Sequence, residues 1–185
     1  MCEMNIRNEK KRKRFDARDC AFVALFVALM LASQVALSSI PGVELVTVLL
    51  LCFSFTFGVK RGMFTATTFS LARQIVFGVF PVVLILYLLY FNGLACIFGY
   101  FGKKMVANRK TLIWVMITAC VCSVGFTCMD NLLTPLWYGY SQKATIAYFY
   151  ASFSFMIPHL VCTAVSVSVL FLPIVRTLSR VCKVG

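Results

Sequence analysis

Apolar runs separated by short polar or basic gaps follow one another along the whole chain. Most of these runs approach the length of about 20 apolar residues that a membrane-crossing helix needs. Pro41, Gly42 and Pro81 fall in or beside the gaps, where such residues interrupt helices. The pattern predicts six helices, at residues 21–37, 45–59, 62–80, 82–101, 111–129 and 149–175. The stretch 130–148 is expected to be an aromatic-rich loop.

The composition places these helices in a bilayer. Of the 185 residues, 61% are hydrophobic and 13% are charged, whereas a soluble domain carries about 25% charged residues. Residues 36–38 weakly resemble a signal-peptide cleavage site, but the first run is longer than usual for such a signal and further runs follow it. We expect an all-α integral membrane bundle of six transmembrane helices. It would form one domain at residues 19–178, between cytoplasmic tails at 1–18 and 179–185.

The basic residues predict the orientation of this bundle. Sixteen of the 18 Lys and Arg lie in the N-terminal tail, at 60–61, in the gap 103–110 and near the C-terminus. The alternate gaps hold only Lys143, and basic loops stay in the cytoplasm. Both termini are therefore expected in the cytoplasm. The membrane is expected to be the plasma membrane. The net charge of +12 is explained by contact with anionic lipid, and nucleic acid binding is not expected.

Polar residues within the apolar runs gather toward the predicted outer end. An arginine in a membrane helix is costly, so Arg73 is expected to face a partner or a wet cavity. It could reach the headgroups, pair with Asp130, or line a ligand pocket open to the outside. Glu44 and Asp130 are the only acidic residues beyond residue 19, so any ion pair is expected to use one of them. The candidate substrate-binding residues are Gln34, Glu44, Arg73, Gln74, Asn92, Asp130, Asn131, Tyr138 and His159.

Two further patterns each leave two interpretations open. The aromatic residues around Trp137 and Tyr138 suit an interfacial belt, and they equally suit a lid that stacks on a flat ligand. Ala24, Ala28 and Ala32 recur every four residues and form one stripe on the first helix. Small residues let helices approach closely in lipid, either within the bundle or with another protein.

Catalytic and metal-binding patterns are not found in the sequence. There is no GxSxG, HExxH or paired-carboxylate motif, and no CxxC pair that would indicate zinc. We expect no cofactor, no metal and no enzymatic activity. An enzyme using His159 and Asp130 as acid and base is an alternative, although the two residues are predicted at different depths. The chain also lacks a phosphate-binding GxxxxGK[ST] loop, so a partner would have to drive uphill transport.

The chain resembles the substrate-binding S components of energy-coupling factor (ECF) vitamin transporters over residues 15–180. The resemblance rests on the basic tail, the alanine stripe, the string IPGVELVT at 40–47 and the turn FGVKRG at 57–62. It implies that Ala24, Ala28 and Ala32 dock on a transmembrane T component, which works with two ATPase subunits. It also implies that the loop 38–44 and the outer loop before the last helix cover the ligand.

This resemblance implies capture of a vitamin or related micronutrient at the outer face for ATP-driven uptake. Because S components differ strongly in their pockets, the candidate binding residues come from predicted depth and not from the family. Arg73 would suit a carboxylate, phosphate or carbonyl of the ligand. The alternative is a small permease, for example of a queuosine precursor, that works without an ATPase.

Overall fold

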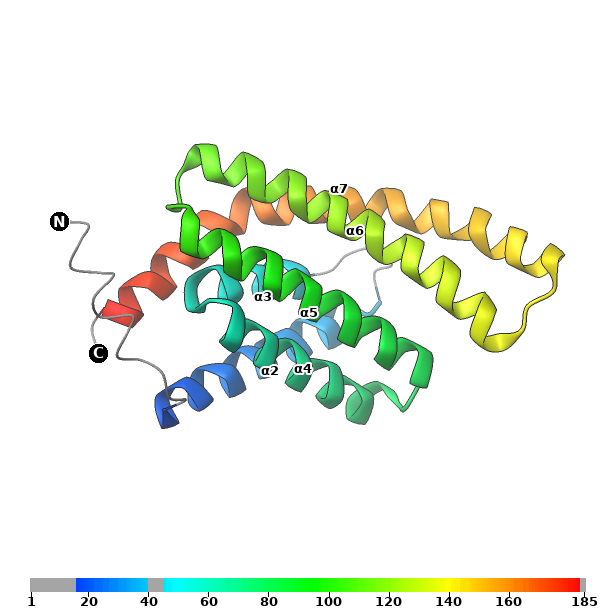
Figure 1. Ribbon diagram of the computed structural model, residues 1–185, viewed down its shortest axis with the longest axis horizontal. Helices are drawn as coiled ribbons and strands as arrows, with labels where there is room; N and C mark the ends of the chain where they lie inside the picture. The colour runs from blue at the N-terminus through cyan, green and yellow to red at the C-terminus, as the bar shows by residue number, and fades with distance from the viewer. Residues whose placement is uncertain (1–15, 40–44, 184–185) are drawn as a thin grey trace.

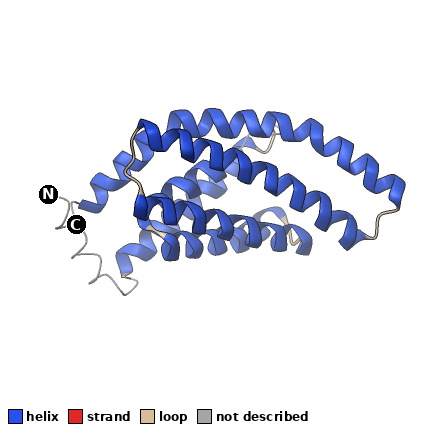
Figure 2. Cartoon of the chain, turned by 45° about the horizontal axis from the view of Figure 1, so that its top comes forward, coloured by secondary structure: helices blue, strands red, loops and turns tan. Residues whose placement is uncertain are grey.

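The chain folds into helices joined by short turns. The computed structural model describes residues 16–39 and 45–183, and within them it contains no strand (Figure 2). The six helices are α2 (Ala17–Leu37), α3 (Val46–Phe57), α4 (Val59–Phe77), α5 (Pro81–Lys104), α6 (Arg109–Tyr138) and α7 (Gln142–Lys183). The predicted all-α class and the count of six helices are confirmed for these residues.

Helix α3 is the centre of the bundle and not a spanning helix. Its 12 residues correspond to about 18 Å, which is shorter than the bilayer core of about 30 Å. Residues 46–55 are all buried, and α3 packs against α2, α4, α5 and α7. A helix that is apolar on every side belongs in a core.

Four of the described helices, α2, α5, α6 and α7, are long and apolar enough to cross a membrane. The remaining long helix, α4, carries Lys60 and Arg61 in its first turn and Arg73 near its end. The structure therefore supports the predicted number of six helices. Four of them have the length and apolarity of membrane-spanning helices. This is the architecture of a multi-pass membrane protein.

The described chain begins and ends at the same end of the bundle. Arg18 at the start of α2 donates a hydrogen bond of 3.0 Å from Nη2 to the carbonyl oxygen of Val181 near the end of α7. Figure 1 shows this end on the left, and the α4–α5 and α6–α7 turns on the right. We call these two ends the terminal end and the hairpin end.

Glycines allow α5 to cross close to the α3–α4 turn. Gly58 makes this turn with φ +83°, a conformation that L side chains rarely adopt. A Cβ atom on Gly99 would lie 2.6 Å from the backbone nitrogen of Val59, and one on Gly102 would overlap the carbonyl oxygen of Phe55. Backbone therefore packs on backbone here, in the manner of small residues at membrane helix interfaces.

The predicted loop at 130–148 is wrong, because the structure makes nearly all of it helical. Helix α6 continues to Tyr138 and α7 begins at Gln142. Gly139 ends α6 with φ +63°, the left-handed conformation that glycine accepts at helix C-termini. The aromatic and polar composition of this stretch was misleading. Helix α6 accommodates Pro135 near its end. The α6–α7 hairpin extends beyond the other helices (Figure 1).

The prediction that any ion pair would use Glu44 or Asp130 is also wrong. Within the described part of the chain the ion pair joins Arg61 to Asp19, with 2.7 Å between Nη2 and Oδ2. Asp19 lies in the first turn of α2 and also forms a capping box with Asp16. Arg61 reaches it because Lys60 and Arg61 belong to α4, which packs on α2, and not to a loop.

Candidate functional site

Tyr87 of α5 is the point where polar side chains from two other helices meet. The amide nitrogen of Gln34 on α2 donates to the Tyr87 hydroxyl over 3.4 Å. The guanidinium carbon of Arg73 on α4 lies 4.5 Å from the centroid of the Tyr87 ring and 5.1 Å from that of Phe77. Arg73 points inward because it lies one and two turns beyond buried Phe69 and Ala66 on α4.

Aromatic rings extend this group to α6 and α7. The Tyr87 and Phe126 ring centroids are 6.0 Å apart. Phe126 in turn stacks on His159, with centroids 6.5 Å apart and an interplanar angle of 15°. We call Gln34, Arg73, Tyr87, Phe126 and His159 the Tyr87 cluster. It joins one side chain from each of five helices.

Several polar atoms in and beside the cluster are buried without a hydrogen-bond partner among the described residues. They include Nε and Nη1 of Arg73, Oε1 of Gln34 and Nε2 of Gln74. The orientation of the Gln74 amide is set by the Phe80 N–H, which donates to Gln74 Oε1 over 2.9 Å. A buried polar group without a partner costs about 1–3 kcal/mol, and more when it is charged.

Arg73 differs from Arg61 in what compensates its charge. Arg61 pairs with a carboxylate, whereas Arg73 is surrounded by aromatic rings. A ring face attracts a cation, but it leaves the N–H donors along the edges of the guanidinium without strong acceptors. The cluster therefore holds a permanent positive charge with unused donors.

The remaining predicted binding residues lie outside this cluster. Asn92 accepts a hydrogen bond of 3.2 Å from Thr67 and donates one of 2.9 Å to the Leu88 carbonyl. These contacts engage the amide within the α4–α5 pair. Glu44 lies outside the described residues.

Asp130 and Asn131 belong to a separate network within the α6–α7 hairpin. The Asp130 carboxylate accepts hydrogen bonds of 2.7 Å from both Thr134 and Tyr148. The Asn131 side-chain oxygen accepts one from Ser152 of α7. Asp130 therefore does not pair with Arg73, which was one interpretation of the sequence.

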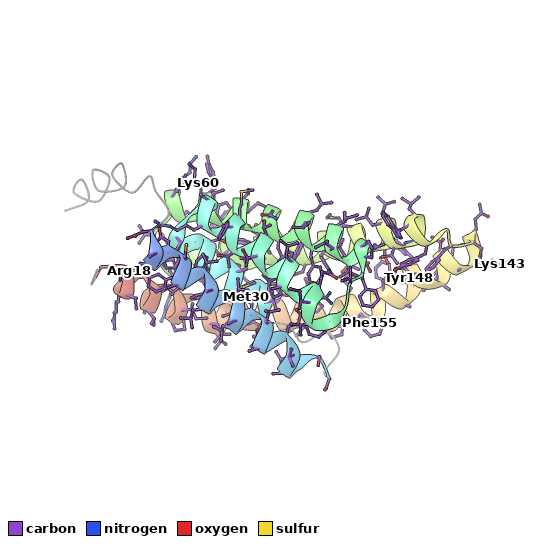
Figure 3. All side chains as sticks on the ribbon, turned by 90° about the horizontal axis from the view of Figure 1, so that it is seen from below. Arg18, Met30, Lys60, Lys143, Tyr148 and Phe155 are labelled. Atoms are coloured by element: carbon purple, nitrogen blue, oxygen red, sulfur yellow. The ribbon has the colours of Figure 1, made fainter. Side chains whose placement is uncertain are left out.

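Tyr138 lies at the tip of the same hairpin and is 53% exposed. Its ring stacks on that of Tyr140, with centroids 6.1 Å apart. Figure 3 shows the neighbouring Lys143 at the outermost point of the hairpin. The aromatic residues thus stand on a helical projection and not on a flexible loop.

Tyr87 and Phe126 were missed by sequence reasoning. Tyr87 shares one face of α5 with buried Leu94 and Phe98, and it directly follows a polar-free stretch. A tyrosine hydroxyl at membrane depth needs a hydrogen-bond partner. This need for a hydrogen-bond partner, combined with the helical spacing of Tyr87 from Leu94 and Phe98, was the signal in the sequence that indicates Tyr87.

The alanine stripe of α2 faces away from the bundle. Ala24, Ala28 and Ala32 are all exposed, with Leu25 beside them 63% exposed. The opposite face of α2 packs inward through Val23, Phe26, Val27 and Met30. Packing within the bundle, one of the two interpretations of the stripe, therefore does not account for it.

A hollow lies at the terminal end, away from the Tyr87 cluster. It has a volume of about 200 Å³ and is lined by Ala107, Val175, Arg176, Ser179 and Arg180. Both arginines are exposed, as expected for basic residues near a lipid headgroup region.

Comparison with protein-family models, curated proteins and solved structures finds no match to this chain.

Proposed function

We propose that the chain is the membrane-embedded, substrate-binding subunit of an ECF-type importer in the plasma membrane. It would capture a vitamin-like micronutrient at the hairpin end, which would face outward, with both termini in the cytoplasm. The observation that carries this proposal is a group of buried polar atoms at Gln34, Arg73 and Gln74 that lack a hydrogen-bond partner within the described part of the chain.

The free-energy cost of burying those polar atoms without partners favours a binding role over a purely structural one. Each buried donor without an acceptor destabilises the empty protein, and an unpaired charge does so most strongly. A ligand that supplies acceptors for Arg73 and Gln74, and a donor for Gln34 Oε1, recovers this free energy when it binds. The three residues come from α2 and α4, near the end of each helix at the hairpin end.

The exposed face of α2 supports the proposed partners. Ala24, Ala28 and Ala32 form an outward stripe of small side chains, which would let a helix of a T component approach closely. Two ATPase subunits would then provide the energy, because the chain has no phosphate-binding loop. The sequence resemblance to S components indicates the same surface.

An Ala28→Trp variant tests the docking role. The indole would separate α2 from an approaching helix, so we expect ATP-driven uptake to be lost while ligand binding persists. Val121→Trp is the matched control, since Val121 is 65% exposed on the distant helix α6 and should tolerate the same ring. Both variants are compared in cells that contain the T component and both ATPases.

The same experiment separates the importer subunit from a stand-alone permease. Uptake by the wild-type chain in cells without any coupling subunit, unaffected by Ala28→Trp, would contradict the proposal and favour a permease.

A reporter fused to the C-terminus tests the orientation. We expect a cytoplasmic fluorescent reporter to be active there and a periplasmic or extracellular enzyme reporter to be inactive.

A further inference from the structure

The geometry around Arg73 restricts the chemical class of the ligand. The rings of Tyr87 and Phe77 lie 4.5 and 5.1 Å from its guanidinium carbon. They cover the group with apolar surface but supply no strong hydrogen-bond acceptor. The buried Nε and Nη1 donors have no hydrogen-bond partner among the described residues, so a ligand acceptor would approach along the plane of the guanidinium.

Nε and Nη1 do not share an edge of the guanidinium, because each forms its parallel N–H pair with Nη2. A carboxylate on either edge matches one such pair with its two coplanar oxygens, and these charge-assisted pairs are stronger than neutral hydrogen bonds. Gln74 lies next to Arg73 and offers a further buried donor at Nε2. A neutral carbonyl would accept from the same donors but would leave the arginine charge uncompensated.

The charge balance of the cluster points to a single negative charge. Arg73 is the one permanently charged member of the Tyr87 cluster, and the described acidic residues are engaged or distant. Asp19 pairs with Arg61 at the terminal end, and Asp130 accepts from Thr134 and Tyr148. Burial of a dianion such as a phosphate monoester opposite one cation would leave an uncompensated charge.

We propose that the ligand is a small organic monocarboxylate whose carboxylate pairs with Arg73. This inference rests on the proposed binding function and specifies the substrate class of the same site. The Tyr87 cluster continues from Arg73 through the rings of Tyr87, Phe126 and His159, so aromatic acids are suitable probes.

The test uses the full-length chain, purified from membranes in mild detergent. Molecules retained by the protein are released by denaturation and identified by mass spectrometry. We expect a small carboxylic acid, retained roughly 10- to 100-fold less by Arg73→Gln, as a lost charged hydrogen-bond pair predicts. Arg73→Lys should be intermediate, because it keeps the charge but not the planar pair of donors. Lys143→Gln, which removes a charge at the hairpin tip, should behave as wild type.

A second measurement depends on the wild-type protein alone, in case the Arg73 variants do not fold. Benzoate, benzamide and benzamidine share a ring and carry a negative, neutral and positive group. We expect millimolar benzoate to raise the melting temperature, and the other two probes to leave it unchanged.

The outcomes distinguish this inference from the proposed function. A retained small molecule without a carboxylate, bound equally by Arg73→Gln, would overturn the carboxylate inference and leave the binding function standing. Phospholipid as the only anion lost from Arg73→Gln would overturn it as well, since Arg73 would then bind a headgroup. A wild-type protein that retains no small molecule and does not respond to benzoate would overturn both.

Discussion

Arg73 and Tyr87 face each other across the α4–α5 pair, with the guanidinium carbon 4.5 Å from the ring centroid. The two helices are joined by the short turn at residues 78–80 and pack along their length. Tyr87 also accepts a hydrogen bond from Gln34 of α2. One tyrosine thus contacts both the half-buried cation and the nearest amide, so its ring and its hydroxyl have separable roles.

Substitutions of Tyr87 should separate these two roles. Tyr87→Phe keeps the ring under Arg73 and removes the hydrogen bond from Gln34, so it should cost about 1 kcal/mol of stability. Tyr87→Leu also removes the ring, and should cost about 1–2 kcal/mol more, the range of a desolvated cation–π contact. Thermal unfolding in detergent measures both.

The matched control is Tyr100→Leu on the same helix. Tyr100 is 51% exposed and lies 4.6 Å from the ammonium group of Lys104, so its cation–π contact is solvated and weak. Equal losses of stability for Tyr87→Leu and Tyr100→Leu would show that Arg73 gains nothing from the ring of Tyr87.

The helical bundle was predictable from the sequence because lipid imposes a strong pattern. Apolar length and Pro or Gly punctuation indicated the six helices, while their bounds depended on tertiary contacts. Lys60 and Arg61 were expected between helices, yet they lie in the first turn of α4, where Arg61 pairs with Asp19 of α2. The stretch after residue 130 was expected to be a loop, yet Asp130 bonds to Thr134 one turn along α6 and to Tyr148 on α7.

The candidate site was less predictable, since depth along a helix does not specify which way a side chain points. Gln34 and Arg73 were expected at one depth, and both contact Tyr87. Asp130 was assigned to the same pocket, but its hydrogen bonds are made within the hairpin. Tyr87 itself looked like one more apolar position, because an aromatic ring scores as hydrophobic while its hydroxyl organises the polar contacts.

The α6–α7 hairpin should depend on Asp130 more than on either of its partners. Tyr148→Phe and Thr134→Val each remove one of the two bonds to the carboxylate, and each should cost about 1 kcal/mol. Asp130→Ala removes both and should cost about 2–3 kcal/mol. Hydrogen exchange of residues 132–147 measures the effect locally, with Lys143→Gln as a control at the tip. Unchanged exchange in Asp130→Ala would exclude a role for this carboxylate in holding the two helices together.

Two glycines on α5 provide a matched pair of substitutions. A Cβ atom on Gly102 would overlap the Phe55 carbonyl oxygen, whereas one on Gly93 would meet nothing within 4 Å. Gly102→Ala should therefore force α5 away from α3 and cost about 1–3 kcal/mol. Gly93→Ala should leave stability unchanged or raise it by up to about 1 kcal/mol, because it favours the helix. The melting temperatures should move in opposite directions or differ clearly, and similar values would contradict the close crossing of α5 over the α3–α4 turn.

The Asp19–Arg61 pair should fix α2 against α4, and a double-mutant cycle can measure its contribution. Asp19 is 7% exposed, and its side chain also caps α2 at Asp16, so Asp19→Asn should cost about 2–4 kcal/mol by leaving Arg61 without a counter-charge. Arg61→Gln should cost a similar amount. The double variant should be less unstable than the sum of the two, with a coupling energy of about 1–3 kcal/mol. Lys60→Gln serves as the exposed neighbouring control. Because α2 carries Gln34 at its other end, a loosened α2 should also weaken ligand retention in the Asp19→Asn variant. Additive effects with no coupling would mean that α2 is held by apolar packing alone.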